Sequence, residues 1–191
     1  MVPGALDRLF HFVGGVAGPW RVLSTRTVRG EGLAPAARLD VVAGALPTES
    51  AARTWVLRGV VSNERYVTRV EKTALVAVQE APGRPDAHRA ALIPIKKSAA
   101  WWALTQDERR AIFEERSAHT AIGMGYLPAV ARRLHHARDL GEPFDFLTWF
   151  DYRAEDEARF DELVGRLRET EEWRYVEREV DVRLARQPVD V

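Results

Sequence analysis

Two passages of the chain repeat one plan, in which a helix lies between two β-rich segments. The β-rich segments are dense in aromatic and β-branched residues, or alternate them with polar ones, as strands do. The segments are 54–61, 71–80 and 90–97 in the first passage and 144–152, 155–170 and 175–184 in the second, with the helix in the middle each time. Two such units predict an α+β fold with an antiparallel sheet and helices on one face, the ferredoxin-like plan.

The remaining segments are assigned from local signals. WRVLSTRTV, from Trp20, predicts a further strand, and residues 30–53 are looser. Pro94 suggests that its strand lies at an edge or carries a bulge. Thr105 and Glu108 form a capping box that begins a helix ending near His119, and we expect a second helix over 127–138. We therefore predict one domain over 1–191, with ferredoxin-like halves at about 20–100 and 101–191.

Composition excludes several classes of protein. Lysine and arginine number 28, as do aspartate and glutamate, so the zero net charge argues against a nucleic-acid binder. The absence of cysteine excludes disulfides, zinc–thiolate sites, iron–sulfur clusters and cysteine nucleophiles. No stretch approaches the ~20 apolar residues of a membrane span. LFHFVGGVAG resembles a signal-peptide core, but His11 interrupts it, so we expect a cytoplasmic protein without a membrane anchor.

Common catalytic motifs are missing: there is no Gly-x-Ser-x-Gly, no His-Glu-x-x-His and no phosphate-binding glycine loop. The stretch HTAIGMGYLPAVARRLHH nevertheless holds three of the five histidines. Taken singly, each residue has an ordinary explanation. His119 would be a satisfied structural histidine, and Arg132 would extend to solvent from a helix. His135 and His136 would lie on a solvated face.

The order of these residues carries more information than any one of them. The series comprises Lys97-x-x-x-Trp101-Trp102, Thr105-x-x-Glu108-Arg109-Arg110, His119-x-x-x-Gly123-x-x-Tyr126, Arg132 and Leu167-Arg168-x-Thr170-Glu171-Glu172. This series resembles the chlorite dismutase family over most of the chain, from about Trp20 to Leu184, and its compact dimeric branch in particular. The resemblance implies a dimeric α+β barrel with helices outside, bound haem b and a homodimer.

The resemblance also implies roles for individual residues. His119 corresponds to the proximal haem ligand, and Arg132 to the distal arginine. Glu171 or Glu172 would accept a hydrogen bond from His119; adjacency leaves the choice open, and Glu172 is favoured. The other implied haem-site residues are Lys97, Trp101 and Tyr66 around the propionates, and Gln79, which can hold an alternative rotamer of the arginine. Trp102 and Trp149 are expected in the core.

The implied activity is conversion of chlorite to chloride and O₂. Chlorite would pass an oxygen atom to ferric haem, and the hypochlorite held by Arg132 would then recombine with it. The sister coproheme decarboxylases of haem synthesis have an uncharged glutamine at the position of Arg132, so the arginine favours chlorite chemistry. Coproheme decarboxylation and a non-catalytic haem-carrying or haem-sensing role remain as alternatives.

Overall fold

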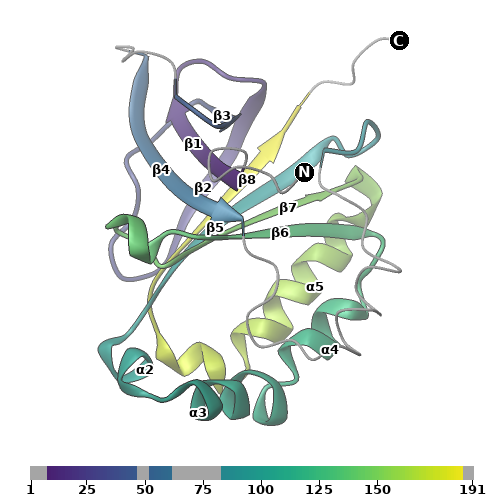
Figure 1. The fold of residues 1–191 in the computed structure, drawn as a ribbon. Coiled ribbons are helices and arrows are strands. Elements are labelled where there is room, and N and C mark those ends of the chain that lie inside the picture. The colour runs from purple at the N-terminus through teal and green to yellow at the C-terminus, as the bar shows by residue number, and fades with distance from the viewer. Residues whose placement is uncertain (1–7, 47–51, 62–82, 187–191) are drawn as a thin grey trace, which may run out of the picture.

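The computed structural model describes residues 8–46, 52–61 and 83–186. Eight antiparallel strands close into a barrel, and the helices lie on one side of it (Figure 1). The strands are β1 (Leu9–Gly15), β2 (Trp20–Arg29), β3 (Arg38–Ala43), β4 (Arg53–Val61), β5 (Arg89–Lys97), β6 (Val130–His136), β7 (Phe146–Tyr152) and β8 (Val176–Ala185). The predicted α+β class and antiparallel barrel are confirmed.

The strand order around the barrel is β1-β3-β2-β8-β5-β7-β6-β4. This order contains one four-strand arrangement twice. In β4-β1-β3-β2 the strands of the first group appear in the order fourth, first, third, second, and in β8-β5-β7-β6 the strands of the second group do the same. The division therefore falls between β4 and β5, earlier than the expected division near residue 100. Residues 54–61 and 90–97 belong to different groups and do not pair as one strand–helix–strand unit. The helix expected over 71–80, Tyr66 and Gln79 lie outside the described residues.

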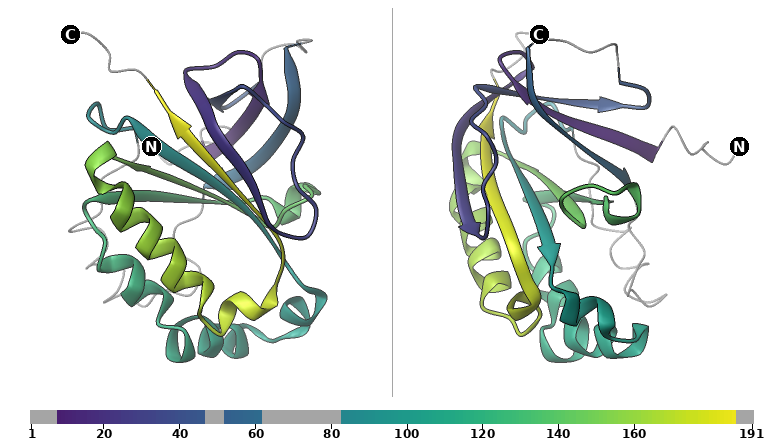
Figure 2. Two further views of the ribbon diagram at one scale, coloured as in Figure 1. Left: turned by 180° about the vertical axis from the view of Figure 1, so that it is seen from behind. Right: turned by 90° about the vertical axis from the view of Figure 1, so that its left-hand side faces the viewer.

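The helices follow β5 and β7 and gather beside strands β5–β8 (Figure 2). They are α2 (Ala99–Ala103), α3 (Gln106–Arg110), a π-helical turn (Ala111–Arg116), α4 (His119–Met124) and α5 (Glu157–Arg168), with short 3₁₀ turns at Arg138–Leu140, Ala154–Asp156 and Glu172–Tyr175. The predicted capping box is present, with the Thr105 N–H donating to Glu108 Oε2 at 2.7 Å.

Two hydrophobic layers result from the alternation of side chains along the strands. Leu92 points into the barrel with Phe12 and Val182, whereas Ile93, the next residue, packs in a second layer that includes Phe160 of α5. One face of β5–β8 thus fills the barrel, and the other face is covered by α5. The functional residues described below belong to this second, helix-covered side.

The helix expected over 127–138 is wrong: most of this segment is strand β6, which pairs with β7 from Val130 to His136. Pairing with neighbours on both sides outweighs the helix-like pattern of the isolated segment. The solvated position expected for His135 is also wrong. His135 is only 1% exposed, and its ring makes T-shaped contacts with Phe10 and Phe12.

Three smaller expectations also need correction. Pro94 is not at an edge, since β5 lies between β7 and β8, and the register to β8 is the same before and after it. The loose segment 30–53 contains β3, and LFHFVGG forms β1, where Phe12 is fully buried. Within the described residues, no helix has the length and apolar character needed to span a membrane.

Candidate functional site

The site is built around a break in the helical segment after β5. Ala118 adopts a left-handed conformation, with φ of 49°, so the helical path stops and α4 begins at His119. This conformation costs about 1–2 kcal/mol for a residue with a Cβ, a strain typical of functional positions. The Thr120 N–H donates to Glu114 Oε2 at 3.1 Å, and Phe113 stacks on the His119 ring with centroids 4.2 Å apart. His119 therefore opens a helix, where the sequence had predicted the end of one, and its ring is held in place.

Glu172 orients His119 from the turn that follows α5. Its Oε2 atom lies 2.7 Å from His119 Nδ1, and its own N–H donates to Ser117 Oγ at 3.0 Å. The neighbouring Glu171 instead pairs with Arg116 at 2.9 Å. Glu172 is thus the carboxylate in contact with the histidine. Because Nδ1 is engaged, Nε2 is the ring atom available to a ligand.

Lys97 pairs with the same carboxylate. Its Nζ donates to Glu172 Oε1 at 2.6 Å, and both residues are 4% exposed. The ammonium also lies over the rings of Trp101 and Trp173, 4.7 and 5.4 Å from their centroids. Burial alone would raise the pKa of the Glu172 carboxyl, but the charges of Lys97 and His119 and hydrogen bonds from both lower it to about 2. The sequence predicted that Lys97 would lie beside a haem propionate. In the structure its ammonium group is paired with the carboxylate of Glu172.

Trp101, whose ring lies beneath the Lys97 ammonium, carries a hydrogen-bond donor without a partner in the described residues. It is 2% exposed, and within the described part of the chain its indole Nε1 has no hydrogen-bond partner. Buried polar groups of native proteins are almost always hydrogen-bonded, so a lone buried donor indicates a ligand acceptor.

Arg132, in β6, faces α4. A Cβ placed on Gly123, four residues after His119, would lie 3.3 Å from Arg132 Nη1. Glycine at this position therefore lets the guanidinium pack against the helix that carries His119. Burial lowers the pKa of Arg132, and the charges of Glu114 and Glu172 oppose that effect. Arginine still remains a cation at any working pH.

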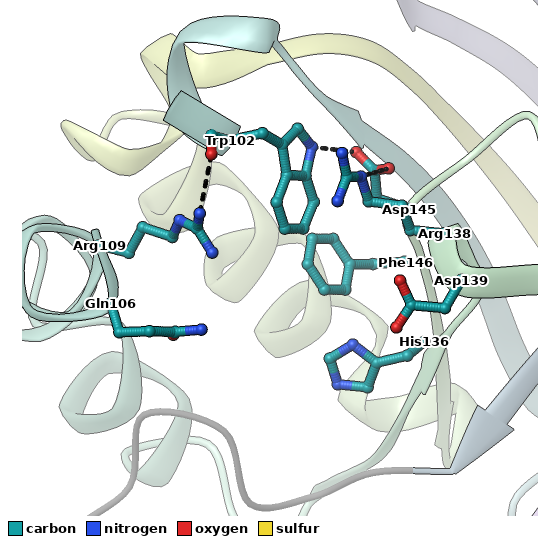
Figure 3. Close-up of a pocket in the computed structure, with 8 residues that line it drawn as sticks. All are labelled: Trp102, Gln106, Arg109, His136, Arg138, Asp139, Asp145 and Phe146. Carbon is teal, nitrogen blue, oxygen red and sulfur yellow. Dashed lines mark hydrogen bonds and ion pairs between the residues drawn. The ribbon is translucent and has the colours of Figure 1, made fainter. Parts of the chain in front are cut away.

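A pocket of about 200 Å³ lies beside Trp102, the residue next to Trp101 (Figure 3). The Trp102 ring lies between two guanidinium groups, 3.9 Å from Arg138 and 5.0 Å from Arg109. The expectation that Trp102 belongs to the core is wrong, because it is only half-buried and lines this pocket. Trp149 does lie in the barrel core, as predicted.

The described residues contain no group of three or more His, Cys, Asp and Glu side chains that could hold a bare metal ion. A single histidine backed by a carboxylate suits a metal whose other ligands come from a cofactor.

Comparison with known proteins decides the family. A family model for chlorite dismutase matches residues 44–187. The chain belongs to the chlorite dismutase family. Members of this family are haem-dependent.

The individual relatives agree with this assignment. A dimeric chlorite dismutase from Nitrobacter winogradskyi is 57% identical, with a TM-score of 0.86 over 93% of this chain and 99% of that one. The Candidatus Nitrospira defluvii chlorite dismutase solved with imidazole shares the fold, with a TM-score of 0.65 over 94% of this chain and 92% of that one, at 24% identity. The Ideonella dechloratans chlorite dismutase is 36% identical over 91 residues, which are 47% of this chain but only 30% of that relative.

The structure brings together five of the sequence-predicted residues, His119, Glu172, Lys97, Trp101 and Arg132, and leaves Glu171 on Arg116. Sequence reasoning missed the supporting contacts of Phe113, Glu114 and Ser117. All three lie within six residues of His119, so proximity in sequence was the one available signal.

Proposed function

We propose that this protein is a haem b-dependent chlorite dismutase, which converts chlorite to chloride and O₂. One observation carries the proposal: a half-buried arginine packs against the helix that begins with a carboxylate-backed histidine. This arrangement combines a histidine prepared to ligate iron with a fixed cation for a small anion.

The residues present fit a haem. His119 would ligate the haem iron through Nε2, and the unpartnered Trp101 Nε1 would donate a hydrogen bond to a propionate. Lys97 supports this site through its ion pair with Glu172. The family resemblance adds Tyr66 near the propionates and Gln79 near the arginine. A haem held by His119 would supply a ferric iron for oxygen-atom transfer from chlorite.

The network behind His119 sets the character of the ligand. The Glu172 carboxylate accepts the Nδ1 hydrogen, which makes the imidazole more electron-donating. Lys97 keeps that buried carboxylate ionised, consistent with its low pKa. The histidine is thereby held in one tautomer and one orientation at neutral pH.

Arg132 suits the substrate because chlorite is an anion that needs no proton to react. The overall change, ClO₂⁻ to Cl⁻ and O₂, balances in atoms and charge without an acid or a base. A guanidinium cannot act as a base at working pH, but it can hold an anion. In a site shielded from water, the fixed charge would keep hypochlorite close enough to recombine rather than escape.

An oxygen-electrode trace tests the proposal. Haem-loaded protein is expected to release one O₂ for each chlorite consumed. Arg132→Gln should lose at least about 10²-fold in rate while its haem content is unchanged. A wild-type trace without O₂ would refute the proposal. Mass spectrometry of the porphyrin after incubation with coproheme and peroxide would then separate a decarboxylase from a haem carrier.

We also propose that the protein is a homodimer. The support is its 57% identity, over 93% of the chain, to a protein described as a dimeric chlorite dismutase. Light scattering of the haem-loaded protein should give twice the mass of the chain, and a monomer would contradict this proposal.

A further inference from the structure

We infer that Asp145 is a positioning residue for the His119 side of the site, because its carboxylate anchors the end of β5 from which Lys97 reaches Glu172. The inference rests on the proposed function, since Glu172 is the carboxylate that orients the proposed haem ligand. Asp145 itself lies in the connection between β6 and β7.

The Asp145 side chain is buried and fully engaged. It is 5% exposed, and its Oδ2 atom accepts hydrogen bonds from the Lys97 backbone N–H at 2.7 Å and from Trp102 Nε1 at 3.1 Å. Arg138 Nε lies 3.6 Å from the other oxygen. Figure 3 shows Trp102 and Arg138 converging on this carboxylate. One side chain thus connects β5, α2 and the turn after β6.

The need for this acceptor follows from how β5 ends. Pairing of β5 with β7 stops at Ile95 and Phe146, and the register with β8 shifts between Lys96 and Lys97. The Lys97 N–H lies beyond the ladder with β7, so the Asp145 carboxylate takes the place of a strand carbonyl. The Asp145 backbone joins the same arrangement, since its N–H donates to the Ile95 carbonyl at 2.9 Å.

The anchored segment contains two residues of the site. Lys97 and Trp102 are both hydrogen-bonded to Asp145, and Trp101 lies directly before Trp102 in the same short helix. Loss of the carboxylate would leave the buried Lys97 N–H and the half-buried Trp102 Nε1 without their acceptor and would release this turn. The 2.6 Å contact between Lys97 Nζ and Glu172 depends on where the turn holds the lysine backbone.

Asp145 acts through Lys97 and not on the reacting atoms. Its hydrogen bonds and ion pair involve Lys97, Trp102, Arg138 and neighbouring backbone, and none of them reaches His119 or Glu172. Its effect on the iron should therefore disappear once the lysine ammonium is removed. This dependence separates positioning from a general effect of charge.

The test is the midpoint potential of the haem iron in wild type, Asp145→Ala, Lys97→Met and the double variant. Asp145→Ala is expected to shift the potential in the same direction as Lys97→Met, and the double variant is expected to match Lys97→Met alone. A wild-type potential in Asp145→Ala, or shifts that add in the double variant, would overturn the inference. Asp139→Asn removes another carboxylate from the same pocket and should keep the wild-type potential; an equal shift there also overturns it.

Two further measurements keep the inference testable. If Asp145→Ala does not fold, Asp145→Asn preserves the shape and one acceptor, and it should give a smaller shift of the same sign; an unchanged potential counts against the inference. Amide hydrogen exchange at Lys97 in the haem-free protein should be at least about tenfold faster in Asp145→Ala than in wild type. Equal exchange rates would overturn the inference. Failure of wild type to bind haem, in contrast, would refute the proposed function and leave the exchange result standing.

Discussion

His119 Nδ1 and Glu172 Oε2 lie 2.7 Å apart although 53 residues separate them in the sequence. The contact joins the start of α4 to the turn after α5, and Lys97 at the end of β5 completes it from a third element. The network therefore exists only when the second half of the chain has folded around it. Substitutions in this network and beside Arg132 should therefore differ in whether they change stability or activity.

Replacing Lys97 should destabilise the fold. Lys97→Met leaves Glu172 buried without its cation, which is expected to cost about 3 kcal/mol in the free energy of unfolding at pH 7. The matched control is Lys96→Met, because Lys96 makes an ion pair of similar length, 2.7 Å, with Glu177 on the surface. That variant should change stability by less than about 1 kcal/mol. Urea unfolding of the haem-free proteins measures both values, and equal costs would contradict the buried pair.

Adding a methyl group at position 123 should impair turnover through Arg132. In Gly123→Ala the new Cβ would lie 3.3 Å from Arg132 Nη1, so the guanidinium must move. A displacement of about 1 Å can cost about 10²-fold in rate, and this contact requires a shift of only a few tenths of an ångström, so we expect chlorite turnover to fall by up to about 10-fold with haem still bound. Gly165→Ala is the control. Its Cβ would meet nothing within 4 Å, so that variant should keep full activity and gain up to about 1 kcal/mol of stability. Full activity in Gly123→Ala would contradict the role assigned to Arg132.

His135 should make the fold sensitive to acid. Burial, with smaller effects of the charges of Arg133 and His136, lowers its pKa from 6.5 to about 4, although a hydrogen bond with the Leu147 carbonyl opposes this. The folded protein then binds the proton more weakly than the unfolded chain does. The stabilisation is complete above about pH 6.5 and is lost as pH falls toward 4. Between pH 7 and pH 5 this residue should cost about 2 kcal/mol.

Unfolding of the haem-free wild type and of His135→Leu at pH 7 and pH 5 measures this dependence. Leucine keeps an apolar contact with Phe10 and Phe12 and does not titrate. The variant should therefore lose about 2 kcal/mol less than wild type between these two pH values. Equal losses would show that other groups set the acid sensitivity.

Sequence periodicity was enough to find the elements whose two faces differ. Residues 175–184 alternate apolar and polar side chains because one face of β8 fills the barrel. Residues 144–152 carry a similar pattern and form β7, although β7 buries aromatic residues on both faces. The apolar stripe of α5, with Phe160 and Leu163, was visible for the same reason. Barrel closure was not visible, because the β2–β8 and β4–β6 pairings join distant segments and leave no local pattern.

Some residues of the site could likewise be predicted from the sequence, and others could not. Ordered motifs indicated His119, Arg132, Lys97 and Trp101, and the choice of Glu172 over Glu171 needed the turn geometry of the folded chain. Strand β6 was mistaken for a helix because Arg132, Arg133, His135 and His136 give it no apolar alternation; its half-buried arginines and buried histidine are explained by tertiary contacts alone. Asp145 carried no motif, since its contact with Lys97 spans 48 residues.

The absorption spectrum of the protein with added haem b tests the central claim most directly. Wild type should show the Soret band of a histidine-ligated ferric haem at one haem per chain, and His119→Ala should lose that band or most of the bound haem. Identical spectra and equal haem content in wild type and His119→Ala would contradict the assignment of His119 as the ligand, and with it the site proposed around Glu172 and Lys97.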